Sequence, residues 1–217
     1  MTLWLSPLPQ LETGVTHPAP APLTRRGRAY WRLAQHAAQW SPTAHTGRVA
    51  LLAVAVAWQL GLSPDQVREV CLAGLLHDLG KLFIPTRVRR KAGSLSAQEW
   101  CQMQRHPVYS ARLTGLLPGA SRTVRGAVRH HHERLDGAGY PDRLSGEAVP
   151  LLARVLAVCD VYDALISPRS YKQAWPAEAV VRELRAQAGP HLDPQVVAAL
   201  GAVLGWPPTP GSDRAVC

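Results

Sequence analysis

The chain has 217 residues, of which 47% are hydrophobic and 18% are charged, and its formal net charge at pH 7 is +9. This composition excludes a disordered chain, a collagen and a coiled coil, and the length favours a single globular domain. The longest uncharged apolar stretch, residues 49–58, is much shorter than the roughly 20 residues that a membrane-spanning helix needs. Residues 1–10 contain two prolines and no basic residue, which argues against a secretory signal. We therefore expect a cytoplasmic protein.

Positive charge is concentrated in the first two thirds of the chain, where residues 41–150 hold 14 basic and 8 acidic residues. A basic surface attracts polyanions, which include nucleic acids, anionic membranes and small phosphorylated ligands. An ordinary solvated basic face explains each cluster equally well, so charge alone does not identify a partner. The two clusters consist of Arg87, Arg89, Arg90 and Lys91, and of Arg122, Arg125 and Arg129.

The distribution of proline and of apolar residues predicts one folded unit between two tails. Residues 1–27 are rich in proline and show little apolar periodicity, so we expect a poorly ordered tail. Residues 28–206 are expected to form one helical domain, and residues 207–217 a C-terminal tail. No strand-like alternation stands out in the sequence, and the fold class is predicted to be all-α.

The predicted domain consists of about seven to eight helices, because apolar residues recur with a helical period. Ser63 and Pro64 are a typical N-cap and first helical residue, and Gly61 and Gly80 are expected to end helices. The predicted helices span residues 29–40, 45–60, 65–79, 96–117 with a break expected before Pro107, 121–133, 150–166, 176–188 and 193–204.

Histidine and aspartate form the strongest pattern in the sequence. His77 and Asp78 are adjacent at a predicted helix end, and Asp160 and Asp163 lie in an apolar helix, where a buried carboxylate needs a partner or a metal. Imidazole and carboxylate together bind Zn, Fe, Mn or Ni. Residue chemistry alone therefore suggests a metallohydrolase, although sequence spacing does not show that the residues converge. The candidate ligands are His45, His77, Asp78, His106, His131, His132 and Asp160.

These motifs resemble those of the HD-GYP family, the branch of the HD-domain metal-dependent phosphohydrolases that hydrolyses cyclic di-GMP. The resemblance covers residues 45–197, and its most specific part is the run over residues 131–141, HHERLDGAGYP. The other matching motifs are His77-Asp78 followed by Gly80-Lys81, then His106-Pro107, and then Asp160 to Leu165 with Arg169, Tyr171 and Lys172.

The resemblance implies an HD-domain helical bundle around a dinuclear metal site, with iron as the expected metal and manganese as the alternative. It implies that Asp78 bridges two ions and that Lys81 neutralises or orients the phosphodiester, so that both act in catalysis. Tyr140, Arg169 and Lys172 are implied to bind the substrate, because a guanidinium can bind a phosphate or a guanine edge. The implied metal ligands are His45, His77, Asp78, His106, His131, His132 and Asp160.

The activity implied by the resemblance is hydrolysis of cyclic di-GMP to pGpG by a metal-activated hydroxide, with further cleavage to GMP left open. One alternative is a catalytically weak module that binds cyclic di-GMP, or a diguanylate cyclase partner, as a receptor. Another is an HD phosphohydrolase for a different nucleotide. A GGDEF-type protein and a second copy of the chain, forming a homodimer, are the further partners considered. Nucleic acid is not expected, because no aromatic stacking platform or known binding motif is present.

The sequence departs from the family pattern at several positions. Ser41 occupies the place of a glutamate that helps some members to bind a third metal, so two metals are expected. Ser110 follows the His-Pro pair where glycine is common, and Ser170 precedes Tyr171 where proline is usual. His130 makes a triple histidine, but the register of the motif favours the two that follow, so His130 is expected to support the site or to lie on the surface.

Overall fold

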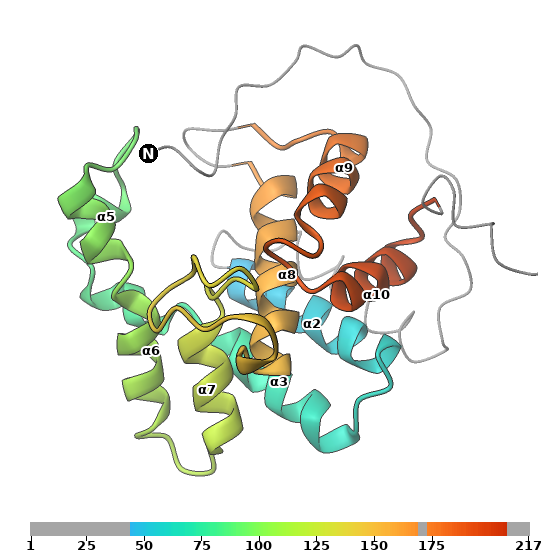
Figure 1. Ribbon diagram of the computed structural model, residues 1–217. Helices are drawn as coiled ribbons and strands as arrows, with labels where there is room; N and C mark the ends of the chain where they lie inside the picture. Colours follow the sequence, from blue (N-terminus) through green and yellow to red (C-terminus); the bar gives the residue numbers. More distant parts are fainter. Residues whose placement is uncertain (1–43, 169–172, 208–217) are drawn as a thin grey trace, which may run out of the picture.

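The computed structural model describes residues 44–168 and 173–207. Within these ranges the chain forms nine α-helices, including the single-turn α4, and two 3-10 helices, with no β-strand (Figure 1). The predicted all-α fold is confirmed. The helix predicted over residues 29–40 and both predicted tails lie outside the described residues. The helices are α2 (Ala44–Gln59), α3 (Pro64–Leu76), η1 (Leu79–Phe83), α4 (Thr86–Arg89), α5 (Ala97–Met103), α6 (His106–Thr114), α7 (Arg122–His130), η2 (Gly146–Ala148), α8 (Leu151–Ile166), α9 (Ala177–Gln187) and α10 (Pro194–Leu204).

Two helices form the centre of the bundle. Residues 49–57 of α2 are all buried except Leu51, and residues 155–159 of α8 are all buried. A helix that is apolar on every side is stable only when other helices surround it. Accordingly, α2 packs against α3, α8 and α10, while α8 also contacts α3, α7, α9 and α10. Figure 1 shows α8 running through the middle of the molecule with α2 beside it.

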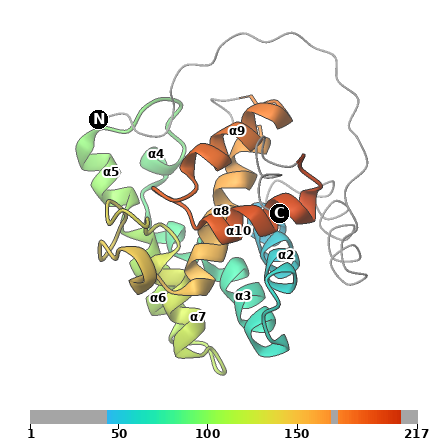
Figure 2. The ribbon, with the colours of Figure 1, turned by 45° about the vertical axis from the view of Figure 1, so that its right-hand side comes forward.

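The remaining helices cover this centre on two sides. On one side α7 packs against α3, α6 and α8, and α6 also packs against η1. On the other side α9 and α10 pack against each other and against α8 (Figure 2). The two sides differ in their chemistry, because the histidine and aspartate motifs lie at the ends of α3, α6 and α7. The bundle thus brings one set of helix ends together next to α8.

Local sequence signals explain several helix boundaries. Ser63 accepts a hydrogen bond from the backbone N–H of Gln66, and the Gln66 side chain accepts one from the Ser63 N–H, which forms a capping box before Pro64. Asp193 caps α10 in a related way, and Gly205 ends it with a φ of 68°. The expected break before Pro107 is also confirmed, since α5 and α6 are separate helices.

The predicted helix over residues 65–79 ends earlier than expected, at Leu76, and a 3-10 helix follows it. Gly80 therefore does not end α3, and it is not among the glycines with positive φ. It lies against the start of α6, where an added Cβ would approach the His106 carbonyl oxygen to 2.2 Å and the Ser110 nitrogen to 2.5 Å. Glycine is needed here for a close approach between two backbones. The single-turn α4 was not predicted.

None of the helices in the two described ranges is both long enough and apolar enough to cross a membrane. This agrees with the short apolar stretch in α2, whose residues are buried by other helices. Cytoplasmic localisation stays a prediction.

Candidate metal centre

All seven predicted metal ligands lie close together, although they come from five different segments. His77 and Asp78 directly follow α3, and His131 and His132 directly follow α7. His106 begins α6, His45 lies in the first turn of α2, and Asp160 lies within α8. Their possible ligand atoms form three overlapping groups, and within each group these atoms lie within 4.8 Å of one another. The groups are His45 with His77 and Asp78, His77 with His131 and Asp160, and His106 with His131 and His132.

Three of these histidines are oriented by the same local hydrogen bond. The Nδ1 atom of His77 lies 2.7 Å from the carbonyl oxygen of Gly74, three residues earlier. His106 and His131 make the equivalent contacts to the carbonyls of Met103, at 2.8 Å, and Val128, at 2.7 Å. A carbonyl oxygen can only accept, so each Nδ1 carries the proton and each Nε2 has a free lone pair. Histidines that bind metals in proteins are commonly fixed in this way.

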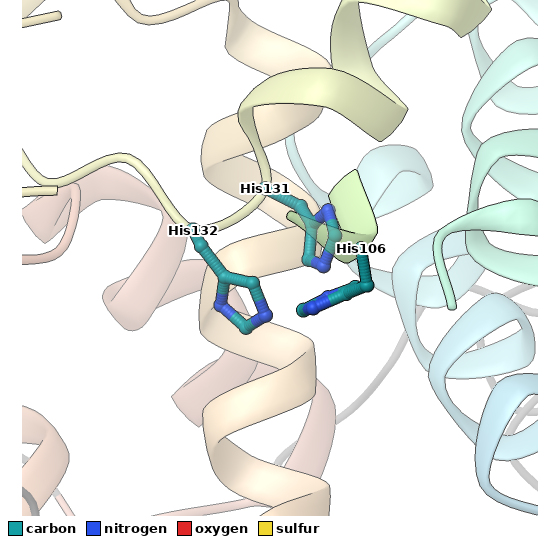
Figure 3. A group of neighbouring side chains, drawn as sticks. All are labelled: His106, His131 and His132. Carbon is teal, nitrogen blue, oxygen red and sulfur yellow. The ribbon is translucent and has the colours of Figure 1, made fainter. Parts of the chain in front are cut away.

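The free lone pairs are buried and have no hydrogen-bond partner. Among the described residues, Nε2 of His77, Nε2 of His106, Nε2 of His131 and Oδ1 of Asp78 are buried polar atoms without such a partner. Figure 3 shows the rings of His106, His131 and His132 turned toward one another. Buried polar atoms are rarely left unpaired, and several of them facing one site call for a common ligand. Imidazole nitrogens with carboxylate oxygens fit a transition-metal ion, so the residues present fit the expected metal.

His45 is held by a carboxylate and not by a carbonyl. Its Nδ1 lies 2.6 Å from Oδ2 of Asp163, while its Nε2 lies 3.1 Å from Asp160 and 3.6 Å from Asp78. Arg48 donates to both oxygens of Asp163, at 2.6 and 2.9 Å, and to the Ser167 hydroxyl at 3.0 Å. Asp163 is thus a buried, paired carboxylate that fixes the ring of His45.

Burial lowers the basicity of most of the cluster. It lowers the pKa of His106 to about 4, with nearby Lys81 adding to the effect, and it lowers the pKa of His132 to about 3, helped by His106. The pKa of the fully buried His131 also falls well below its usual value. These imidazoles are neutral at physiological pH, and the neutral form is the one that binds metals.

The carboxylates act in the opposite direction on His45. Burial alone would lower the pKa of His45, but hydrogen bonds to Asp160 and Asp163 outweigh it and raise the pKa to about 9. Burial likewise disfavours the charged form of Asp78, yet His77 and Lys81 hold its pKa below the usual value. The cluster therefore keeps its carboxylates ionised, and a bound cation would take the place of the proton on His45.

Lys81 and Tyr140 lie at the edge of the cluster. Nζ of Lys81 is 2.6 Å from Oδ2 of Asp78, and the Lys81 side chain is partly exposed. The ring of Tyr140 stacks on His132 with centroids 4.9 Å apart. Burial, together with the charges of Asp160 and Asp78, raises the pKa of Tyr140 well above its usual value. Its hydroxyl stays protonated and can donate a hydrogen bond.

The loop that carries Tyr140 is attached to the end of α7 by Glu133. This buried carboxylate accepts hydrogen bonds from the N–H groups of Asp142, at 2.7 Å, and Leu144, at 3.2 Å. Gly139 packs so closely on this segment that an added Cβ would lie 2.5 Å from the Glu133 Cα. Gly137 has a φ of 75°. Positive φ thus explains the glycine at position 137, whereas Gly139 is needed for a close backbone contact.

Several site features were not predicted. The sequence marks Asp163 as a carboxylate that is costly to bury, but it does not predict that Asp163 holds His45, nor does it predict the roles of Arg48 and Glu133. In the sequence, Asp163 and Arg48 stand out only as charged residues in or beside apolar runs. Glu133 stands out only as an acidic residue within the HHERLDGAGYP motif. Ser110, which stands where glycine is common in the family, has a structural role, because its hydroxyl accepts a hydrogen bond from the Gly80 N–H at 2.7 Å.

His130 contacts Asp142, with Nε2 2.8 Å from Oδ2 of that residue. Its side chain is only 16% exposed, so His130 is a partly buried residue beside the loop and belongs to none of the three ligand groups. The predicted substrate-binding residues Arg169 and Lys172 lie outside the described residues, as do Ser41 and Ser170.

The fold and the site together define an all-helical protein with a buried imidazole and carboxylate centre. Residues 31–196 match the family model described as HD domain. The chain belongs to the HD domain family, and the expected HD-GYP membership is confirmed.

Several curated proteins and solved structures are similar to the chain. It is 44% identical over 161 residues to the cyclic di-GMP phosphodiesterase PA4108 of Pseudomonas aeruginosa, which covers 74% of this chain and 39% of that protein. It is 40% identical over 158 residues to the 3'3'-cGAMP-specific phosphodiesterase 2 of Vibrio cholerae, and this match covers 71% of this chain and 30% of that protein. The fold resembles that of an HDG"Y"P protein from Bdellovibrio bacteriovorus, with a TM-score of 0.62 and 20% identity over 82% of this chain and 64% of that one. The chain thus spans well under half the length of these curated relatives.

Proposed function

We propose that this protein is a metal-dependent phosphodiesterase that hydrolyses cyclic di-GMP to pGpG. The observation that carries this proposal is a set of buried ligand atoms on His77, Asp78, His106 and His131 beside Lys81. Within residues 44–168 and 173–207 these atoms have no hydrogen-bond partner. The similarity to cyclic di-GMP phosphodiesterases supports the substrate. Further cleavage of pGpG to GMP stays open.

The donor set fits two divalent ions. His45, His77 and Asp160 would serve one ion and His106, His131 and His132 the other, with Asp78 between them. Iron is the expected metal and manganese the alternative. Bound ions supply an activated water and positive charge for an in-line displacement at phosphorus.

The chain's own groups bind and orient the phosphodiester. Lys81 contacts Asp78 and is partly exposed, so its ammonium group can bind a phosphate oxygen at the edge of the cluster. Tyr140 keeps its proton and can donate to a second oxygen of the substrate. Arg169 and Lys172 are proposed to bind phosphate or guanine, as the family resemblance implies.

The proposal is tested with full-length protein purified without exposure to air. Metal analysis should find about two ions per chain, with iron predominating, and incubation with cyclic di-GMP should release pGpG. Intact cyclic di-GMP after incubation with metal-replete protein, together with measurable binding, would instead favour the receptor alternative. A protein that neither binds nor hydrolyses cyclic di-GMP would contradict both the phosphodiesterase proposal and the receptor alternative.

A second candidate substrate is 3'3'-cGAMP, because one relative at 40% identity carries that specificity in its name. The two dinucleotides differ in one base, so the metal centre does not distinguish them. Competition between both substrates in one reaction measures the ratio of their kcat/KM values. A ratio above one for cyclic di-GMP is expected, and a clear preference for 3'3'-cGAMP would assign the protein to the second candidate.

A further inference from the structure

A row of three aromatic rings leads from the protein surface to the ligand cluster. Trp100 on α5 contacts Tyr140 with ring centroids 6.0 Å apart and an angle of 79° between the rings. Tyr140 in turn stacks on His132, with centroids 4.9 Å apart and an angle of 30°. His132 belongs to the ligand group that also contains His106 and His131. Trp100 is therefore the outer end of a row whose inner end is a proposed metal ligand.

The indole of Trp100 is accessible, with 38% of the residue exposed. Its helix is well anchored in spite of its short length. Ser96 and Glu99 form a capping box, and Glu99 also pairs with Lys91 at 2.6 Å. In a T-shaped pair, either the edge of the indole meets the face of the phenol or the reverse. In both arrangements at least one face of the indole is left uncovered by Tyr140.

We propose that Trp100 binds a purine base of the substrate by stacking. This inference rests on the proposed function, which places a phosphodiester at the cluster beside Lys81 and Tyr140. A cyclic dinucleotide carries a base on either side of each phosphate, so a base must extend outward from the cluster. The indole face that Tyr140 leaves uncovered, on a residue that is 38% exposed, offers that base a flat apolar partner. Stacking of a base on an aromatic side chain is tolerant of base identity.

Trp100 accordingly contributes affinity for purine dinucleotides in general and does not separate cyclic di-GMP from 3'3'-cGAMP. A competing role is purely mechanical, with Trp100 supporting the ring of Tyr140. The two roles make different predictions for a substrate that lacks a base. Loss of stacking affects only substrates with bases, whereas loss of support for Tyr140 affects every phosphodiester.

The test compares Trp100→Ala and Trp100→Phe with the wild-type protein and with Leu116→Ala. Leu116 is an exposed apolar residue in the turn between α6 and α7, and its replacement controls for loss of surface hydrophobic area. For cyclic di-GMP we expect Trp100→Ala to raise KM about ten-fold with kcat little changed, and Trp100→Phe to restore most of the affinity. Methyl p-nitrophenyl phosphate, a small diester without a base, should be hydrolysed equally by all variants.

An unchanged KM for cyclic di-GMP in Trp100→Ala would overturn the proposal, and so would an equal loss of activity on the small diester. Tryptophan fluorescence gives a readout that does not depend on turnover. Titration with pGpG should quench the wild-type protein more strongly than Trp100→Phe. If the wild-type protein fails to hydrolyse cyclic di-GMP, the proposed function fails. Quenching by cyclic di-GMP that disappears in Trp100→Phe would still support stacking, and equal quenching in both would overturn it.

Discussion

The ligand cluster has an imidazole half, made of His106, His131 and His132, and a carboxylate half, made of His45, His77 and Asp160. The two halves differ in how their rings are held in place. In the imidazole half, His106 and His131 donate from Nδ1 to carbonyls three residues earlier, within the same turn of chain. In the carboxylate half, His45 is held by Asp163, 118 residues away in the sequence. In the first half the two rings are oriented by their own segments, as the ring of His77 also is, whereas the ring of His45 is oriented only after α2 and α8 have packed together. Local and long-range organisation can therefore be separated by mutation.

The largest effect is expected at the residue that joins the halves. Oδ2 of Asp78 lies 3.6 Å from His45 and its Oδ1 lies 3.5 Å from His106. Asp78→Asn removes the charge shared by both halves, so hydrolysis of cyclic di-GMP should fall below detection and metal content should drop. Product analysis by chromatography and metal analysis measure this. Asp65→Asn, at an exposed position on α3, is the matched control. Robust turnover by Asp78→Asn would remove its bridging role.

Asp163→Asn should affect only the carboxylate half. The amide cannot hold His45 and Arg48 as the carboxylate does, and loss of such a supporting group typically lowers metal affinity about 10- to 100-fold. Stepwise titration with metal should show one weakened site and one unchanged site. Equal weakening of both sites would mean that the two halves are not independent.

Removal of metal should destabilise the fold, because the buried Nε2 atoms of His77, His106 and His131 have no other partner in the part of the chain that the structure describes. A ligand present at about 100 times its dissociation constant stabilises the native state by about 2.7 kcal/mol. For a chain of this size, the melting temperature should fall by about 5–10 °C on chelation. Circular dichroism with and without chelator measures this, with addition of metal as the control for reversibility. An unchanged melting temperature would contradict a metal bound at these atoms.

A smaller effect is expected at Glu133, which attaches the loop to the imidazole half. Glu133→Gln keeps one acceptor oxygen but loses the charge that holds the N–H groups of Asp142 and Leu144. Hydrogen bonds to charged groups contribute about 1.5–3 kcal/mol, so kcat/KM should fall about ten-fold while metal content stays the same. Glu147→Gln, at an exposed position in η2, is the control. Loss of metal from Glu133→Gln would show that the loop and the ligands are not separable.

The smallest effect concerns the basic cluster that follows η1, whose residues are exposed. If this cluster attracts an anionic dinucleotide, its neutralisation should slow association and flatten the salt dependence without changing kcat. Stopped-flow measurement at several salt concentrations tests this. An unchanged association rate would identify the cluster as an ordinary solvated surface. The replaced residues are Arg87, Arg89, Arg90 and Lys91.

The difference between the halves also explains what could be predicted from the sequence. The helices and most of their boundaries follow from apolar periodicity and from caps such as Ser63 and Asp193. The candidate ligands follow from motifs, and their convergence agrees with the family resemblance. The pairing of His45 with Asp163 and the packing of Gly80 on α6 could not be predicted, because both depend on contacts between distant segments. For the same reason, the position of Glu133 within its motif does not predict which loop it holds.

Gly74 shows how tightly two constraints can be joined in one residue. An added Cβ at this position would meet the Ala50 Cα at 2.6 Å, and the Gly74 carbonyl is the group that orients His77. The spacing between α2 and α3 and the aim of a candidate ligand are therefore set at the same point of the chain. A change of metal preference that required a shift of His77 would therefore also require a redesign of the interface between α2 and α3.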